Sequence, residues 1–415
     1  MKNKPTVSNI ERPIKVLFVS HSSGMWGAER SLLLLLKSID RKHFEPIVIL
    51  PGPGPLKEKI DSLNIKIYEV WSPWWVKLQV GKVRFGRRIV KEIIKEIIAV
   101  FRLCRIVSKE KIAVIYTNTI VKFSGAITAI ITKIPHLWHI REIIPDNPDL
   151  HSVLPHKMLF KFISRTSRTI IANSKATASQ FQGINTKNKL RIIYNAQETN
   201  GSHKFNSLKS IDGVKSTDWI VAVVGTFQKR KAQDDAIRAV KIAEGAITNI
   251  KLLLIGDGRK EYKDYLKNLC SELNISDRIV FTGYRDDVPQ ILPHCKLLLM
   301  PSWNEPFGRV VIEAMVAGVP VIGANAGGLK EIIQEGTTGY LVPPKKPEEI
   351  AKKIIYLFHH PDLAKQMGNN GKKVVEERFS VQNYTRGIEN IIREVVNIRC
   401  KRLGSLNVKR TSFIS

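Results

Sequence analysis

The sequence predicts an α/β protein made of two doubly wound domains that face each other across a cleft. Three observations lead to this fold class. The chain has 415 residues, more than one hydrophobic core ordinarily covers. Short apolar runs, each followed by a longer amphipathic stretch, recur through both halves, which is typical of parallel sheets covered by helices. Between the halves lies a polar segment without apolar periodicity, from Asn195 to Thr217.

Each half contains six candidate strands, which set the predicted domains at residues 10–200 and 215–380. Ligands of such sheets bind beyond the carboxyl ends of the strands, so a site is expected in the loops that follow them. The candidate strands of the first half are Val16 to Ser20, Pro46 to Leu50, Ile65 to Val70, Ala113 to Tyr116, Thr169 to Ala172 and Leu190 to Tyr194. Those of the second half are Trp219 to Val224, Lys251 to Ile255, Arg278 to Thr282, Leu297 to Met300, Val319 to Ile322 and Gly339 to Val342.

The chain is strongly basic, with 66 Lys and Arg against 37 Asp and Glu and a formal net charge of +29. Residues 1–200 carry 33 of the basic and 14 of the acidic residues. Such a field attracts polyanions, namely nucleic acid, anionic lipid or phosphorylated substrates. A surface that only aids solubility is an equally open interpretation.

Cysteine usage and hydropathy bear on the compartment. The four cysteines (Cys104, Cys270, Cys295 and Cys400) are far apart and show no metal-ligand or redox spacing, as expected for thiols in a reducing compartment. The first residues lack the apolar core of a signal peptide, and no uncharged apolar run approaches the ~18 residues of a membrane span. We therefore expect a cytoplasmic protein, with peripheral attachment to the inner face of the membrane as an option.

The strongest functional signal follows the candidate strand Leu297 to Met300. A loop containing Glu305-Pro306-Phe307-Gly308 leads into a helix candidate at residues 309–318. The first turn of a helix presents unpaired N–H groups and a positive dipole end, which suit a diphosphate, and Gly308 lets that backbone come close. Glu313 lies about one turn further on, where a carboxylate can accept hydrogen bonds from two ribose hydroxyls. Glu305 precedes the turn and is expected to point into the cleft.

A second loop with charge follows the strand Trp219 to Val224. It contains Arg230 and Lys231 and leads into a helix candidate from Asp234 to Ala243. Either cation can neutralise the charge on a phosphate leaving group, each charge-assisted hydrogen bond being worth roughly 1.5 to 3 kcal/mol. The alternative is a solvated basic loop.

Several motifs follow one another in the second half of the sequence. They are Glu305-Pro306-Phe307-Gly308, Glu313-Ala314-Met315, Gly318-Val319-Pro320-Val321, Gly327-Gly328 with Glu331, and Gly339-Tyr340-Leu341-Val342. With these motifs in this order, the chain from Gly225 to about Pro343 resembles the carboxyl-terminal domain of the family-four retaining glycosyltransferases (glycosyl transferases group 1), which have the GT-B fold of two facing Rossmann-like domains.

The resemblance implies a hexosyltransferase that uses a nucleotide-diphosphate sugar, UDP- or GDP-linked, as donor. It implies that Glu313 holds the ribose, that Glu305 contacts the sugar, and that Lys231 and the amides near Gly308 to Val310 hold the diphosphate. The acceptor is expected to be a hydroxyl of a glycan or a lipid-linked molecule, in cell-surface polysaccharide or glycolipid synthesis. Tyr284 stands where the family's loop meets the base.

The first half carries weaker signals. The loop with Gly24 and Gly27 resembles the family's Gly-Gly-x-Glu loop, but Trp26 replaces the first glycine of the pair. His139 matches a histidine that contacts the donor sugar; as an isolated residue it would be read as a structural histidine. Another departure is Ala232, which replaces the glycine after the lysine.

The resemblance thus gives a set of expected site residues. Those expected to take part in the chemistry are His139, Lys231 and Glu305. Those expected to bind the donor are Gly24, Gly27, Arg230, Tyr284, Phe307, Gly308, Arg309, Val310 and Glu313. The resemblance also implies that a final helix, residues 381–400, packs back on the first domain, and we expect a flexible basic tail over 401–415.

The segment from Ile89 to Val107 has a helical apolar period. Residues 82–111 hold 10 basic and 3 acidic residues, and Trp71, Trp74 and Trp75 lie just upstream. One interpretation is an interfacial surface for anionic lipid, and the other is an ordinary helix that covers the sheet.

No Asp-x-Asp motif occurs in the sequence, so we expect neither a metal nor another cofactor. The family resemblance implies that the acceptor hydroxyl attacks on the face that the diphosphate leaves, with a leaving-group oxygen as base, so we expect no covalent enzyme intermediate. Two other functions remain open. A sugar-nucleotide epimerase of the same architecture would turn over the donor without an acceptor. A nucleic-acid-binding protein is suggested by charge alone, and it would need a basic stripe with stacking aromatics, which the sequence does not show, so we expect no specific nucleic acid partner.

Overall fold

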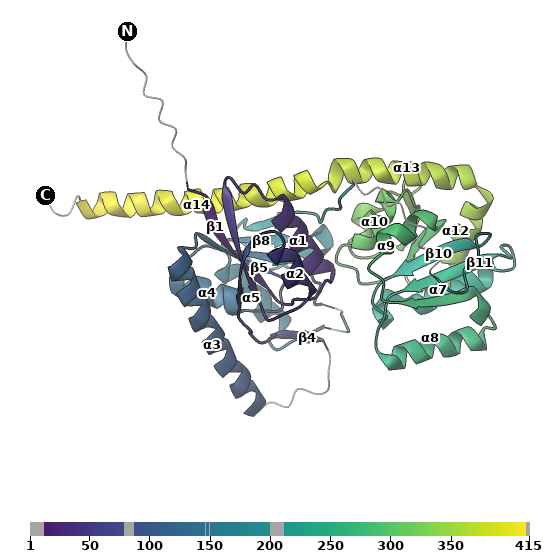
Figure 1. Cartoon of the computed structure of the whole chain (residues 1–415), viewed down its shortest axis with the longest axis horizontal. Coiled ribbons are helices and arrows are strands. Elements are labelled where there is room, and N and C mark those ends of the chain that lie inside the picture. The colour runs from purple at the N-terminus through teal and green to yellow at the C-terminus, as the bar shows by residue number, and fades with distance from the viewer. Residues whose placement is uncertain (1–11, 79–86, 146, 149, 200–210, 412–415) are drawn as a thin grey trace, which may run out of the picture.

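The computed structural model describes residues 12–78, 87–145, 147–148, 150–199 and 211–411 (Figure 1). Two parallel sheets, each with helices packed on it, form two domains side by side. This confirms the predicted α/β architecture. Part of the predicted polar linker, residues 200–210, lies outside the described residues.

The first domain is built on a parallel sheet of seven strands in the order β3-β2-β1-β5-β6-β8-β9. In its centre β1 pairs with β2 and β5, so that Val16 lies in register with Pro46 and Val114. Its inner strands are continuous apolar runs because helices cover both faces. The strands are β1 (Ile14–Ser20), β2 (Phe44–Leu50), β3 (Lys66–Glu69), β5 (Val114–Asn118), β6 (His136–Ile140), β8 (Thr169–Ala172) and β9 (Leu190–Ile192). The helices are α1 (Gly27–Ser38), α2 (Pro55–Asp61), α3 (Arg87–Glu110), α4 (Ser124–Thr132), α5 (His156–Thr166) and α6 (Lys175–Ser179).

The second domain is built on a parallel sheet of six strands in the order β12-β11-β10-β13-β14-β15. The strands are β10 (Trp219–Val224), β11 (Ile250–Ile255), β12 (Ile279–Gly283), β13 (Leu297–Met300), β14 (Val321–Ala324) and β15 (Gly339–Val342). The α-helices are α7 (Gln233–Ala243), α8 (Lys260–Glu272), α9 (Val288–Ile291), α10 (Arg309–Val316), α11 (Leu329–Ile332), α12 (Pro347–His359) and α13 (Pro361–Arg378). Short 3-10 helices span Lys229–Lys231, Ser276–Arg278 and Leu292–His294.

The sequence did not predict three strands of the first domain. β4 (Val76–Leu78) and β7 (Leu150–Ser152) form an antiparallel pair of three residues each, too short to give a period. β6 was missed because His136 and His139 interrupt its apolar run. Both are buried in the sheet, where Thr117 is a hydrogen-bond partner of His136 at 2.8 Å.

Helix α14 (Val381–Thr411) continues from the second domain and lies along the first (Figure 1). The Tyr384 hydroxyl donates to the carbonyl of Ser31 in α1, and a Glu389 carboxylate oxygen accepts from the N–H of Asp40 at 2.8 Å. We expected a flexible tail from Lys401, whereas α14 is helical as far as Thr411. A helix that is already formed lengthens without a further nucleation cost, and Lys, Arg and Leu favour it. Within the described residues, none of the helices combines the length and the apolar character needed to cross a bilayer.

Candidate active site

The loop between β13 and α10 holds Glu305 against a turn of two glycines. The N–H of Gly328 donates to the carbonyl oxygen of Glu305 at 2.8 Å. A Cβ atom at Gly327 or Gly328 would collide with the backbone of Glu305 or Pro306, so this close approach requires glycine at both positions. The glycine pair and the acid, far apart in sequence, therefore act as one unit.

Glu305 is buried and forms an ion pair with Lys231, which follows β10. Ser302 donates a longer hydrogen bond to the same carboxylate oxygen, at 3.4 Å. Burial alone would raise the pKa of Glu305, but the charges of Lys231 and Arg230 outweigh it and hold the pKa below its usual value. The carboxylate is therefore ionised beside two cations. The structure thus brings together three of the predicted site residues.

Arg230 anchors the two loops to each other. Its guanidinium donates to the carbonyl of Asn304 at 3.1 Å, and its own carbonyl accepts from the N–H of Trp303 at 3.1 Å. The 3-10 turn that carries Arg230 and Lys231 ends at Ala232, which has left-handed backbone angles (φ 51°, ψ 44°). This conformation explains why a glycine suits the position after the lysine.

Helix α10 begins after Gly308, whose φ of 99° is open to glycine. Its first N–H groups, at Arg309 and Val310, have no acceptor within the helix, because the first turn of a helix leaves its N–H groups without intrahelical partners. The side chain of Phe307 has a different role from the one expected. It is 2% exposed and packs edge to face on Phe379, with ring centroids 5.7 Å apart. Only the backbone of Phe307 is therefore available to a nucleotide-sugar donor.

Arg309 is partly buried, and its side chain crosses to the first domain, which the sequence did not predict. Its guanidinium donates to the Ser31 hydroxyl at 3.0 Å and to the side-chain oxygen of Gln197 at 3.1 Å. It also lies 3.5 Å from a carboxylate oxygen of Glu313, one turn along α10. Its side chain therefore joins the two domains and neutralises the Glu313 carboxylate.

A cavity of about 660 Å³ lies between the domains. Gly24 and Trp26 line it from the first domain, and Tyr284 and Arg309 line it from the second. Trp26 and Tyr284 are both more than half exposed, and their rings meet edge to face with centroids 6.2 Å apart. Of the predicted donor-binding residues, Gly24, Tyr284 and Arg309 thus line this cavity. Lys231 and Glu305 do not line it.

Gly27 is the first residue of α1, and a Cβ atom there would lie 3.7 Å from the Arg309 side chain, an ordinary contact. A glycine is thus not required at position 27 for packing. At Gly24 a Cβ atom would lie 2.8 Å from the Trp26 indole nitrogen. Trp26 therefore fills the space that a smaller residue would leave beside Gly24.

His139 lies at the end of β6 and is fully buried. Its Nδ1 contacts the hydroxyl of Tyr116 and lies 3.3 Å from the Arg141 guanidinium, while its Nε2 has no hydrogen-bond partner among the described residues. Burial lowers the pKa of His139 well below its usual value, and the charge of Arg141 adds to this, so the ring is neutral. In this arrangement His139 does not reach the cavity, unlike the sugar contact expected from the sequence.

Arg141, which sequence reasoning did not single out, organises the interior of the first domain. Its guanidinium donates to the side-chain oxygens of Asn118 at 2.7 Å and Asn195 at 2.6 Å, and to the hydroxyl of Tyr384 at 2.9 Å. Because Tyr384 belongs to α14, this buried cation ties the last helix to the sheet. Its only signal in the sequence was its place two residues after His139.

Glu29, in the first turn of α1, is a second residue without an assigned role. It is fully buried, and a carboxylate oxygen lies 3.0 Å from Nδ1 of His21, without the alignment of a hydrogen bond. Burial raises the pKa of Glu29 to about 7, and burial with the charges of Lys122 and Arg141 lowers the pKa of His21 to about 3. Glu29 is the glutamate of the Gly-Gly-x-Glu-like loop, which was the available signal.

Glu331, in α11, reaches the first domain as well. Its carboxylate accepts from the N–H groups of Lys175 at 2.7 Å and Ala176 at 2.8 Å, at the start of α6. It also accepts from the Tyr194 hydroxyl at 3.0 Å. The Ser174 hydroxyl donates to the carbonyl of Pro306 beside the Glu305 loop. These contacts hold the domains together next to the predicted donor loop.

Two family models match the chain in succession. The one described as Glycosyltransferase Family 4 matches residues 26–200, and the one described as Glycosyl transferases group 1 matches residues 205–374. An uncharacterized glycosyltransferase of Methanocaldococcus jannaschii is 30% identical over 274 residues, which are 65% of this chain and 72% of that protein. The chain belongs to the group 1 glycosyltransferases.

Other relatives of this glycosyltransferase differ in their names. The N-acetyl-alpha-D-glucosaminyl L-malate synthase of Bacillus anthracis is 32% identical over 242 residues, 57% of this chain and 62% of that protein. The capsular polysaccharide biosynthesis glycosyltransferase CapM of Staphylococcus aureus is 27% identical over 244 residues, 57% of this chain and 58% of that protein. The glycosyltransferase thus spans about three fifths of the length of these two relatives.

The fold of this glycosyltransferase has solved counterparts. The crystal structure of Anabaena HepE in complex with UDP-glucose has a TM-score of 0.76 and 24% sequence identity, and it covers 92% of this chain and 100% of the HepE chain. This similarity, together with the two parallel sheets, confirms the predicted GT-B fold.

Proposed function

We propose that this glycosyltransferase transfers a sugar, with retention of configuration, from a UDP- or GDP-linked donor to an acceptor hydroxyl. The observation that carries the proposal is the ion pair of the partly buried Lys231 with the buried Glu305, beside the first turn of α10. It places an ammonium group, a carboxylate and helix-start amides at the end of one sheet. A nucleotide-diphosphate sugar has the matching groups. Its phosphates suit the ammonium group and the helix-start amides, and its hydroxyls suit the carboxylate.

In the proposed reaction the bond between the sugar and the diphosphate breaks, and negative charge collects on the departing phosphate oxygens. Lys231, with Arg230 close by, and the amides of Arg309 and Val310 stabilise this charge. Glu305 orients the sugar through its hydroxyls, and Glu313 holds the ribose. The acceptor hydroxyl attacks on the face that the diphosphate leaves, and a leaving-group oxygen takes its proton. No covalent enzyme intermediate forms, and no metal ion is needed.

We propose a glycan or lipid-linked acceptor in cell-surface polysaccharide or glycolipid synthesis. The relative named for capsular polysaccharide biosynthesis supports this class. Acceptor screening with the anomeric configuration of the product read by NMR tests both the class and retention. An inverted product would contradict the mechanism. Donor turnover without any acceptor would favour a sugar-nucleotide epimerase instead.

The donor site is tested by thermal shift with UDP-, GDP- and ADP-sugars. We expect at least one to raise the melting temperature of the wild type and of the control variant Glu376→Ala, whose side chain is exposed on α13. Glu313→Ala should lose most of this shift because the ribose hydroxyls lose their acceptor. Activity should persist in EDTA. If no nucleotide sugar stabilises the wild type, the donor site is wrong.

A further inference from the structure

Helix α3 has two apolar faces, although a sheet-covering helix needs one. The inner face packs in the core through Ala99, Val100, Leu103, Ile106 and Val107. The second face, here called the outer stripe, is formed by residues that are each between 44% and 62% exposed: Val90, Ile93, Ile94, Ile97, Ile98 and Phe101. Their spacing of three and one places them along one side of the helix. The apolar period of this segment is thus only partly explained by packing.

The charged side chains of α3 are sorted by sign. From Ile89 onward, where the structure describes the side chains of α3, its lysines and arginines are all exposed, namely Lys91, Lys95, Arg102, Arg105 and Lys109. Of its acids, Glu96 and Glu110 are buried and Glu92 is only partly exposed. At 100° per residue the five cations fall within an arc of roughly 80° along one edge of the outer stripe. The exposed side of α3 therefore carries an apolar stripe with a cationic border.

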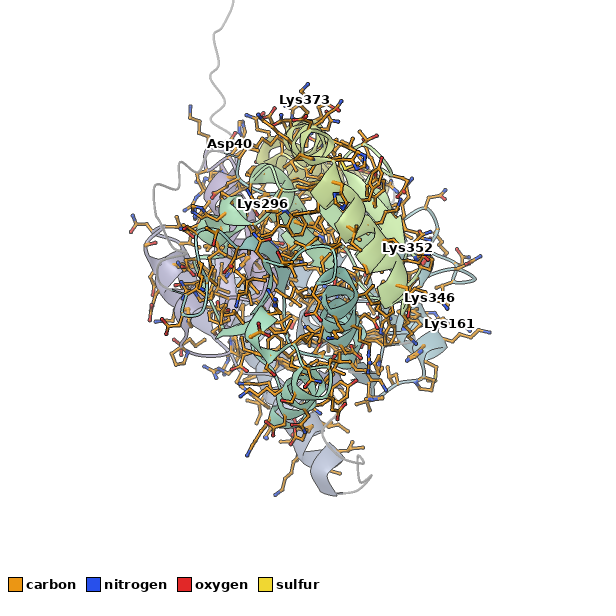
Figure 2. The ribbon with its side chains drawn as sticks, turned by 90° about the vertical axis from the view of Figure 1, so that its right-hand side faces the viewer. Asp40, Lys161, Lys296, Lys346, Lys352 and Lys373 are labelled. Atoms are coloured by element: carbon orange, nitrogen blue, oxygen red, sulfur yellow. The ribbon has the colours of Figure 1, made fainter. Side chains whose placement is uncertain are left out.

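Neighbouring elements extend this surface. Helix α4 packs along α3 and exposes Ile130 by 55% and Ile131 by 60%. Trp71 is 49% exposed, and the Lys95 ammonium lies 4.9 Å from its ring centroid. Figure 1 shows α3, α4 and α5 together on one side of the first domain, with the beginning of α3 projecting beyond the sheet. Helix α5 lies next to α4, and its exposed Lys161 points away from the body in Figure 2.

We propose that the outer stripe of α3, with the end of α4, docks this protein on an anionic lipid bilayer. A bilayer surface takes up isoleucine, phenylalanine and tryptophan at the level of the headgroups and attracts the cationic border. A polyanion such as nucleic acid would satisfy the cations but leave the isoleucines in water. A second copy docked face to face would bring two cationic borders together. The inference is independent of the proposed function, because binding to lipid is measured without turnover.

Flotation with vesicles of phosphatidylcholine, alone or mixed with phosphatidylglycerol, tests the proposal. The wild type should bind the mixed vesicles at low salt and far less the neutral ones. The apolar variant Ile94→Asp with Ile97→Asp should bind at least about tenfold more weakly, because both side chains leave the interface. Its matched control is Ile242→Asp with Tyr265→Asp, which alters two exposed residues of the second domain.

Charge is tested separately from the apolar stripe. Lys91, Lys95, Arg102 and Arg105 are changed together to Gln, and the control changes Lys267, Lys296, Lys365 and Lys373 to Gln. The control residues are exposed in the second domain, and Figure 2 shows Lys373 at its outer side on α13. Both variants lose the same net charge. Only the α3 variant should lose binding, by at least about tenfold.

Three results would overturn the proposal. In the first, the wild type does not bind anionic vesicles at low salt. In the second, the two charge variants lose binding equally, or the apolar variant binds like the wild type, so that binding reflects net charge alone. In the third, light scattering shows a dimer that the apolar variant dissociates, which would assign the stripe to a second copy. Circular dichroism melting confirms that each variant is folded, as expected for exposed positions.

Discussion

Trp26 of the first domain and Tyr284 of the second meet edge to face across the cleft, with ring centroids 6.2 Å apart. Both rings line the cavity of about 660 Å³ between the domains. Trp26 stands where the family's Gly-Gly-x-Glu loop has its first glycine, and a glycine at this position could not form the ring contact with Tyr284. A ring in place of a hydrogen atom narrows the cavity on the side that Tyr284 faces.

Trp26→Ala and Tyr284→Ala should each weaken binding of the nucleotide that the thermal shift identifies. The double variant should lose less than the two single losses combined, because the rings support each other. Such pairs couple by about 0.5 to 1.5 kcal/mol. Isothermal titration calorimetry gives the four dissociation constants, and Tyr265→Ala is the exposed control. Strictly additive losses would show that the two rings act separately.

Lys231→Met should reduce the transfer rate by about a hundredfold or more, because the charge on the leaving diphosphate loses its cation. It should also destabilise the fold, since breaking a buried pair costs about 3 to 5 kcal/mol. Adding Glu305→Gln removes the uncompensated carboxylate and should restore the melting temperature but not the activity. Lys229→Ala, exposed in the same turn, should change neither. Recovered activity in the double variant would rule out the proposed role of Lys231.

Ala232→Gly should stabilise the protein by about 0.5 to 1 kcal/mol. The φ of 51° at Ala232 strains an L-residue, and glycine relieves this by more than it gains in unfolded-state entropy. Ala236→Gly makes the same substitution inside α7 and serves as the control. It should destabilise the protein, because glycine is unfavourable within a helix. Thermal melting compares the three proteins. A lower melting temperature for Ala232→Gly would mean that the turn is not strained.

The variant Glu29→Gln should become increasingly stable relative to the wild type as the pH rises from about 4.5 to about 7. Burial raises the pKa of Glu29 from 4.5 to about 7 in the folded state, so the folded protein binds the proton more tightly than the unfolded chain. The stability that Glu29 contributes is therefore full below 4.5 and declines through this window, by roughly 3 kcal/mol in all. Glutamine keeps the neutral shape throughout. Across this pH range the melting temperature of Glu29→Gln should diverge from that of the wild type. The melting temperature of the exposed control Glu58→Gln should stay parallel to that of the wild type.

The two sheets were predictable because their central strands are buried on both faces and appear as continuous apolar runs. β6 was not, since two of its five residues are histidines whose burial depends on Thr117 and Tyr116 in the neighbouring strand. Local pattern cannot show that a neighbouring strand supplies such a partner.

The strand, loop and helix start that carry Glu305 and Gly308 were predictable, because these segments follow one another in the sequence. The candidate site was not predictable where two domains meet. The reach of Arg309 to Ser31 and Gln197, and the packing of Phe307 on Phe379, depend on segments distant in sequence. The burial of His139 likewise depends on Tyr116 and Arg141. A motif can therefore identify the residue types of a site, while tertiary contacts decide which side chains remain free.

Glu331 belongs to the second domain, yet it supplies acceptors for the first N–H groups of α6 in the first. The first domain therefore depends on the second for acceptors at the start of α6. Pulling the two domains apart at this point would leave Lys175 and Ala176 uncapped, at a cost of about 1 kcal/mol for a lost helix cap. A motion that widens the cleft therefore avoids this cost only if it keeps the hydrogen bonds of Glu331 to Lys175 and Ala176.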